Sequence, residues 1–445
     1  MKFLTEAIGG LKEFGALKTA VQSRALPAAV TGVTGVHKAN IIYSLCSLLG
    51  RRAFVVAGDE PEANRLCADL GAMGLPALFY PLRDFTLRDT EGSSHEYEHQ
   101  RLRALTALQG GGHCAVVCCI DAALQYTLPP AELRRRTVTL KPGAAVPMRR
   151  LLDLLAACGY EPAAQIEGPG QYSHRGGILD FFPPGLSSPV RAEFFGDEID
   201  TLSFFDPLTQ RRTESAPAVT VAPAQEALIA DPAGLAAKIR RLAAELRGKA
   251  APAARAVLGR EAEKLEGGLP LGCADKYLPL LYGGRTATLF DYLQDDMLLF
   301  VSEPVRQREK VRSALWQWGE DLKDYLADGT LCHTLDTYSR DWAFALSQFE
   351  KAGAVYLDTF VHGGYDTPVR TLLNLTVRQR SVWGGSLDQL TDDLKEMLQN
   401  KWACAVLAGN ARAAKTVAAD LRARGIDAAD VESPEKIERG EVVVT

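Results

Sequence analysis

The chain has 445 residues, of which 47% are hydrophobic and 24% charged, and its net charge is −5. This composition excludes a disordered or fibrous protein, and the length predicts three or four domains because a single hydrophobic core rarely grows this large. The acidic balance argues against a chain whose main function is to bind the phosphate backbone of nucleic acids. The nine cysteines show no paired spacing, which indicates reduced thiols in a cytoplasmic setting.

The first part of the chain alternates between strand-like and helix-like segments. The apolar runs "ALPAAVTGV", "RRAFVVAG", "PALFYPL" and "CAVVCCI" are predicted strands, with helices expected near 60–73 and 96–108 between them. Gly50 is expected to end the helix that follows the first strand. This alternation predicts a parallel sheet covered by helices on both faces.

The stretch "GVTGVHKAN" has nearly the residues of a phosphate-binding loop. Gly32 and Lys38 have the spacing of the pattern G-x-x-x-x-G-K-[ST], and Gly35 lies between them, but His37 replaces the second glycine and Ala39 replaces the hydroxyl residue. A side chain at His37 would intrude where glycine lets the backbone curl around a phosphate, and Ala39 offers no oxygen to magnesium. We therefore expect a relict loop without hydrolysis; whether Lys38 still holds an anion is left open.

The alternation of predicted strands and helices ends near residue 125. A helix is predicted in "MRRLLDLLAACGY", and a strand-rich stretch follows, in which "VRAEFF" alternates with Val190, Ala192 and Phe194 on one face. Long helices return from about residue 213, before the strand "DMLLFVSEP", and a further α/β unit is predicted from about residue 346. The chain stops inside the strand-like "EVVVT", which suggests a fragment of something longer.

Two groups of polar residues leave alternatives open. The arginine runs 134–136 and 149–150 could form a basic surface that binds nucleic acid, although a solvated face is the simpler interpretation. His95 and His99 have a spacing that could bind a metal on a helix, but no third ligand is evident nearby, so no metal site is predicted. The chain shows neither a signal peptide nor an apolar run long enough to cross a membrane.

The most specific signal is "GPGQYSHRGGILDFFPPGLSSPVRAEFFGDEIDTLSFFDPLTQR", residues 168–211. It closely resembles domain 2 of the nucleotide excision repair protein UvrB, a domain that also occurs in the bacterial transcription–repair coupling factors. The resemblance covers roughly residues 25–345, and it implies that this domain is inserted in a helicase-like first domain.

Two departures from UvrB favour the coupling-factor family. The second nucleotide motif of UvrB resembles "LLVIDESH", whereas this chain reads "LLFVSEPV", so Ser302 stands in place of the magnesium-binding aspartate and only Glu303 remains. UvrB also carries a tyrosine-rich β-hairpin that threads into DNA, and "TLRDTEGSSHEY" is too short to form it. We therefore expect neither catalytic residues nor a cofactor here; in the coupling-factor family, ATP and magnesium belong to a translocase absent from this chain.

The resemblance implies an α/β multidomain protein with four parts. These are a P-loop, helicase-like parallel-sheet domain with a degenerate loop, an inserted mainly antiparallel α+β domain, a helix-rich continuation of the first domain, and a small C-terminal α/β domain of unknown role. Their expected bounds are 1–124, 125–212, 213–345 and 346–445.

The resemblance also implies a partner, the damage-recognition ATPase UvrA. The implied contacts are Arg175, Arg191 and Phe195, and RNA polymerase and double-stranded DNA are implied partners of the full-length protein. From the residues alone, Arg175 could equally pair with Asp180 or Glu193 inside the sheet. The function expected from the sequence is a UvrA-recruiting adaptor; the alternative is a divergent UvrB-like ATPase that acts directly on DNA.

Overall fold

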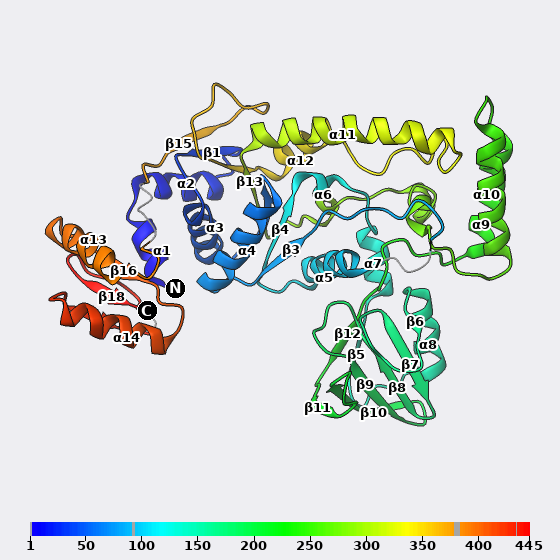
Figure 1. Cartoon of the computed structure of the whole chain (residues 1–445), viewed down its shortest axis with the longest axis horizontal. Coiled ribbons are helices and arrows are strands. Elements are labelled where there is room, and N and C mark those ends of the chain that lie inside the picture. Colours follow the sequence, from blue (N-terminus) through cyan, green and yellow to red (C-terminus); the bar gives the residue numbers. More distant parts are fainter. Residues whose placement is uncertain (1, 91–93, 378–382, 433) are drawn as a thin grey trace.

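The computed structural model describes residues 2–90, 94–377, 383–432 and 434–445. Within these residues the chain forms a seven-stranded sheet, a six-stranded sheet, a three-stranded sheet and a two-stranded ribbon, with helices around them (Figure 1). The predicted α/β multidomain class is confirmed. Among the helices so described, none combines the length and the apolar character needed to cross a membrane.

The seven-stranded sheet is parallel throughout. Its strands, in order across the sheet, are β15 (Thr371–Asn374), β1 (Ala28–Thr31), β14 (Val355–Asp358), β13 (Met297–Ser302), β2 (Arg52–Ala57), β4 (Ala115–Cys119) and β3 (Ala77–Tyr80). The central strands are buried on both faces, as helix-covered parallel strands must be.

Helices cover both faces of this sheet, because side chains alternate along each strand. In β2, Ala53, Val55 and Ala57 face one helical layer, and Phe54 and Val56 face the other. The first layer contains α1 (Lys2–Gly9), α2 (Lys12–Gln22), α3 (Val36–Leu49) and α4 (Glu60–Met73). The second contains α5 (Glu96–Gly110), α6 (Ile120–Leu124), α7 (Pro130–Arg136), α11 (Pro304–Ala327) and α12 (Trp342–Ala352).

The sheet corrects one expectation about the chain after residue 346. The strand in "GAVYLDTF" was expected to start a separate unit, but it is β14, which lies between β1 and β13, and β15 pairs with the other side of β1. Both strands are therefore part of the first sheet. An apolar run of this kind predicts a buried strand, but it does not predict which sheet the strand joins.

The six-stranded sheet forms the second unit, which lies below the first in Figure 1. Its strands are β6 (Glu161–Pro162), β7 (Gln171–Arg175), β8 (Ile178–Phe181), β9 (Val190–Phe195), β10 (Glu198–Phe205) and β11 (Arg212–Ser215). One face packs on α8 (Met148–Ala157) and on the ribbon of β5 (Val138–Leu140) and β12 (Val219–Val221). β12 lies beyond the expected boundary at residue 212 and is part of this unit.

Two further groups complete the chain. A helical hairpin of α9 (Pro232–Glu245) and α10 (Ala251–Glu266) stands at the right of Figure 1, where the long helix α11 runs towards it. Short 3-10 turns follow at Ala274–Tyr277, Tyr282–Gly284 and Leu289–Tyr292. The C-terminal unit has a parallel sheet with the order β16 (Cys404–Val406), β18 (Val442–Val444), β17 (Ala428–Asp430), and it is packed with α13 (Leu387–Gln399) and α14 (Ala411–Ala423).

Local signals set several of these bounds. Gly50 ends α3 with a left-handed φ of 61°, as predicted, because glycine adopts this conformation without steric cost. Asp59 caps α4 by accepting a hydrogen bond of 2.7 Å from the amide of Glu62. The segment expected to be too short for the UvrB hairpin includes residues 91–93, which lie outside the described residues, so that expectation remains untested.

Candidate functional site: a closed phosphate loop and an exposed sheet face

The degenerate loop lies where a phosphate loop would, between β1 and the N-terminus of α3. Gly32 ends the strand with φ 81°, and a Cβ there would stand 2.0 Å from the carbonyl oxygen of Leu375. Gly35 precedes the helix with φ 42°, and His37 folds back so that its Nδ1 lies 3.0 Å from the carbonyl oxygen of Thr34. Ala39 is fully buried in the core beneath the helix. The loop therefore keeps its position and two glycines, but His37 stands in place of the glycine that would precede the lysine.

Lys38 points inward and is only 2% exposed. Its Nζ donates to Oε1 of Glu62 at 3.0 Å, Oγ of Ser302 at 2.8 Å and Oε1 of Glu303 at 2.9 Å. An ammonium group has three hydrogens to donate, and three protein oxygens already take them. The cation that would bind a phosphate is thus neutralised and saturated inside the protein.

Ser302 and Glu303 hold this arrangement from the end of β13. The hydroxyl of Ser302 also donates to Oε1 of Glu62 at 2.8 Å, and Glu303 has a left-handed φ of 50° just before α11. The backbone amide of Thr359 donates to Glu303 at 2.9 Å. Burial disfavours the charged carboxylate, but hydrogen bonds from Thr359 and Lys38 outweigh it and lower the pKa of Glu303.

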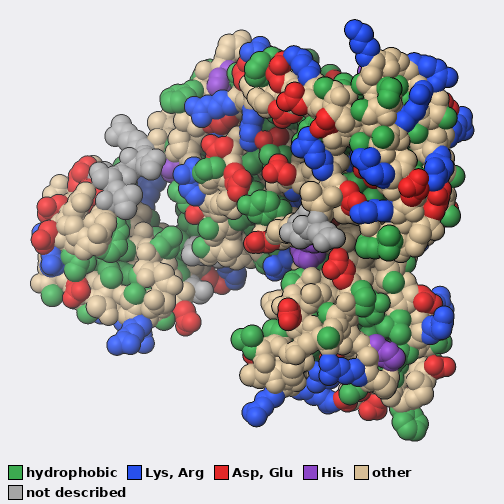
Figure 2. Space-filling model, turned by 45° about the vertical axis from the view of Figure 1, so that its right-hand side comes forward, with side chains coloured by type: hydrophobic (Ala, Val, Ile, Leu, Met, Phe, Trp, Pro, Cys, Tyr) green, Lys and Arg blue, Asp and Glu red, His purple; other side chains and the backbone are tan. Residues whose placement is uncertain are grey.

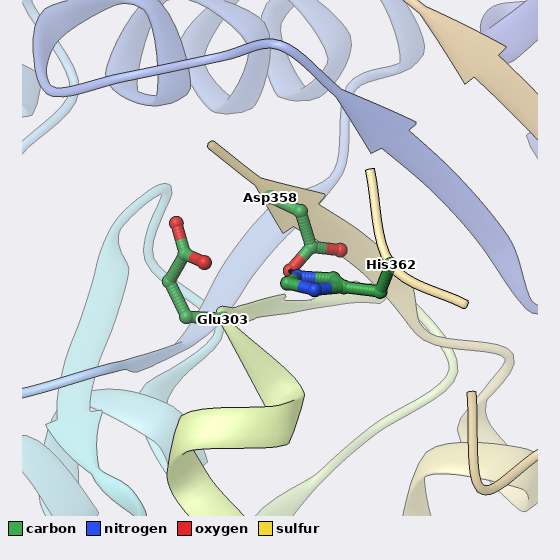
Figure 3. Close-up of side chains that lie close together, drawn as sticks. All are labelled: Glu303, Asp358 and His362. Carbon is green, nitrogen blue, oxygen red and sulfur yellow. Dashed lines mark hydrogen bonds and ion pairs between the residues drawn. The ribbon is translucent and has the colours of Figure 1, made fainter. Parts of the chain in front are cut away.

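Glu303 also faces Asp358 and His362, and the ligand-type atoms of the three residues lie within 4.8 Å of one another (Figure 3). Asp358 ends β14 and is fully buried; burial, with the nearby charge of Glu303 as a smaller cause, raises its pKa. Carboxylates and an imidazole could bind a divalent cation. Here protein donors already contact the carboxylates: Tyr365 donates to Asp358 at 2.7 Å, His362 lies 3.2 Å from it, and Lys38 pairs with Glu303.

The sequence analysis did not predict a role for Glu62. In the structure it is, with Glu303, one of the two carboxylates that contact Lys38. It lies in the first turn of α4, directly after β2. The carboxyl ends of parallel strands share one edge of a sheet, so an acidic residue following β2 was a usable signal for this cluster.

The second candidate region is the outward face of the six-stranded sheet. Strand pairing brings Arg175 opposite Ile178, Ile178 opposite Glu193, and Asp180 opposite Arg191 on this face. Phe195, at the end of β9, is 85% exposed, whereas Phe194 points the other way and packs against the core. The predicted alternation of this strand is confirmed, and it leaves one large aromatic side chain in solvent.

Arg191 is held by its own sheet. Its Nε and Nη2 donate to the two carboxylate oxygens of Asp180, each at 2.8 Å, and its guanidinium lies 4.7 Å from the centre of the Phe205 ring. The edge of the Arg191 guanidinium that could bind a carboxylate of a partner through two hydrogen bonds is therefore already occupied by Asp180. Such pairing fixes the planar group rigidly, and Nη1 also donates to the carbonyl oxygen of Gln210 at 3.3 Å. A partner would therefore meet only the exposed part of the group, since the side chain is 18% exposed.

Arg175 is exposed and donates through its guanidinium to the carbonyl of Ala164. Its two alternative partners are otherwise engaged, since Asp180 binds Arg191 and Glu193 pairs with Arg212. The internal pairing considered for Arg175 is therefore wrong.

In the first arginine run, two of the three side chains pair with a carboxylate of their own helix, whereas Arg149 and Arg150 of the second run are exposed. Arg135 pairs with Glu132 at 2.6 Å, and Arg136 is 7% exposed and contacts the same carboxylate. His95 contacts Glu98 at 2.8 Å, and its ring stacks on His99 with centroids 6.0 Å apart. Glu98, three residues further along the chain, therefore contacts the imidazole of His95.

Comparison with known proteins gives the family context. Residues 138–226 match the family model of the UvrB interaction domain, which runs from β5 to just beyond β12. The transcription-repair-coupling factor of Bacillus subtilis is 24% identical over 431 residues, which cover 93% of this chain. The chain is similar to the transcription-repair-coupling factors over most of its length. The recognition made from the sequence is thereby confirmed.

Other transcription-repair-coupling factors match as well. That of Myxococcus xanthus is 29% identical over 64% of this chain and 25% of its own length, and that of Haemophilus influenzae is 30% identical over 55% and 21%. The chain spans 36% of the length of the Bacillus subtilis coupling factor. The activity of a whole coupling factor therefore cannot be assigned directly to this chain.

Proposed function

We propose that this chain is the UvrA-docking module of a cytoplasmic transcription-coupled DNA repair factor. The observation that carries the proposal is the outward face of the six-stranded sheet, where Phe195 stands in solvent on the same face as Arg175 and the rigidly held Arg191. This face lies within the residues that match the UvrB interaction domain. An exposed aromatic beside arginines is the composition of an interface hot spot.

The module would act by resembling UvrB and so occupying the same surface of UvrA. In the full-length protein, RNA polymerase and double-stranded DNA would also be bound, so that UvrA is brought to a stalled polymerase. The first domain would serve as a scaffold: Lys38 has no hydrogen left for a phosphate, and Ala39 and Ser302 supply neither magnesium contact.

Equilibrium binding to purified UvrA tests the docking proposal. The chain is expected to bind, and Arg191→Ala is expected to weaken binding at least about tenfold, since buried arginine contacts rank among interface hot spots. Arg422→Ala is the matched control, because Arg422 also pairs with a carboxylate, Asp430 at 2.9 Å, but in the C-terminal unit. Both variants are compared at equal thermal stability. Equal affinities of the two variants would move the site elsewhere, and absence of binding by the unmodified chain would refute the proposal.

Phosphate release tests the inactive loop. The chain is expected to hydrolyse ATP at the protein-free background rate, with or without single-stranded DNA. Restoring the loop through His37→Gly and Ala39→Thr is expected to leave that rate unchanged, because Lys38 stays bound to its three oxygens and Ser302 still supplies no magnesium contact. Release above background in the unmodified chain would favour the alternative function, a divergent UvrB-like ATPase that acts on DNA.

A further inference from the structure

The helical hairpin of α9 and α10, residues 232–266, carries eight lysines and arginines against four glutamates, in a chain of net charge −5. Between residues 238 and 260 the only acidic residue is Glu245. The cations of this segment, all exposed, are Lys238, Arg240, Arg241, Arg247, Lys249, Arg255 and Arg260. Two of them form exposed ion pairs within the hairpin, Arg240 with Glu266 at 2.6 Å and Arg241 with Glu245 at 3.1 Å. A charge excess this local, on a projecting element, is the electrostatic signature of a surface that meets a polyanion.

The hairpin has one buried side and one open side. Leu235, Ile239, Leu258 and Leu265 pack into a common core with the segments that follow the hairpin. The cations and several alanines point outward, and the hairpin stands at the edge of the molecule in Figure 1. Figure 2 turns that side forward and shows basic side chains gathered in its upper right part. Because alanine is small, an extended ligand can approach these helices closely.

Two arginines near the turn are fixed in place. Arg255 donates to the carbonyl oxygens of Ala243 at 3.1 Å and Leu246 at 2.6 Å, and Arg247 donates to that of Ala244 at 2.7 Å. These neutral acceptors orient the guanidinium groups without cancelling their charge. Lys249 lies between them in sequence, exposed at the turn. The tip therefore presents three positive charges.

We propose that this hairpin binds the phosphate backbone of double-stranded DNA without reading its sequence. Residues 232–266 contain no aromatic residue, whereas proteins that bind single strands stack bases on aromatic side chains. Asparagine and glutamine, which read base edges, are also missing from this range. Lysine and arginine among alanines supply the charge for phosphate contacts and nothing that would recognise a base. The site is separate from the sheet face proposed for UvrA.

The test is fluorescence anisotropy of a labelled 30-base-pair duplex of arbitrary sequence with the whole 445-residue chain. Binding at 50 mM NaCl is expected to fall steeply with added salt, because bound phosphates release counterions. The triple variant Arg241→Gln, Lys249→Gln, Arg260→Gln is expected to bind about tenfold more weakly or worse. Its salt slope should fall by roughly 0.9 for each phosphate that the variant no longer neutralises.

A control triple removes the same charge elsewhere. Lys395→Gln, Arg412→Gln, Lys415→Gln changes exposed cations of the C-terminal unit and should leave DNA binding unchanged. Equal weakening by the two triples would reduce the effect to net charge and overturn the site. No binding at 50 mM NaCl, or tighter binding of a single strand of equal length, would overturn the proposal. The hairpin triple should keep its affinity for UvrA, so the two proposals can fail independently.

Discussion

Phe195→Ala is expected to weaken binding to UvrA at least about thirtyfold, which corresponds to about 2 kcal/mol. The side chain is 85% exposed in the unbound chain, so almost all of its apolar area is available for burial by a partner. Arg191 lies on the same face of β9, four residues before Phe195, and Arg175 lies on that face two strands away, on β7. Aromatic and arginine side chains on one face are the residue types that concentrate binding energy at interfaces.

Because Phe195 is exposed, its replacement should change binding to UvrA without changing the stability of the fold. Removing a solvent-exposed ring takes away little packing within the folded chain, so the thermal unfolding midpoint should stay within a degree or two of the unmodified protein. The matched control is Phe360→Ala, which removes a ring that is 68% exposed on the loop after β14. Titration calorimetry with UvrA should show weaker binding for the Phe195 variant alone. Unchanged affinity in both variants would remove Phe195 from the docking surface.

The outward face of the six-stranded sheet was predictable from the sequence only as far as the alternation of side chains along one strand reaches. Side chains alternate strictly along a strand, so "VRAEFF" was enough to separate Val190 and Ala192 from Arg191 and Phe195. The partner of Arg191 was not predictable in the same way. Asp180 is eleven residues away in sequence and becomes its neighbour only through the register of β8 against β9.

Features that depend on contacts between residues far apart in the sequence were not predictable from it. The run around β14 was correctly expected as a strand, yet it was placed in a later unit, because insertion between β1 and β13 is decided by contacts across more than 300 residues. The loop at Lys38 shows the same limit. The replacements at His37 and Ala39 were visible in sequence, but the enclosure of Lys38 by Glu62 and Glu303 needed three strands to be brought together.

That enclosure leads to the second large expected effect, a loss of about 3 kcal/mol or more of unfolding free energy on Lys38→Met. Removing one member of a buried ionic cluster leaves the others uncompensated, which typically costs ~3–5 kcal/mol. Here the side chains of Glu62 and Glu303 are 16% and 7% exposed, and both would lose their cation. In an open phosphate loop, the same change would mainly remove nucleotide binding.

Chemical denaturation at pH 7 measures the loss. Lys310→Met is the control, because its ion pair with Asp121 is partly exposed and should contribute less than about 1 kcal/mol. Adding Glu62→Gln and Glu303→Gln to Lys38→Met should restore most of the stability, since no buried charge then lacks a partner. A loss below about 1 kcal/mol for Lys38→Met alone would show that the cluster carries little of the fold.

The pH dependence gives an independent check on the same cluster. The folded pKa of Glu303 is lowered from 4.5, so its stabilising contribution is present above that value and is lost as the pH falls through the lowered pKa. Without Lys38, burial is left opposed by fewer hydrogen bonds and raises the pKa of Glu303, so protonation relieves the variant. The stability gap between the unmodified chain and Lys38→Met should therefore be widest near pH 7 and narrow below about pH 4.5. A gap that stays constant from pH 7 to pH 4 would mean that Lys38 stabilises the chain by packing rather than by charge.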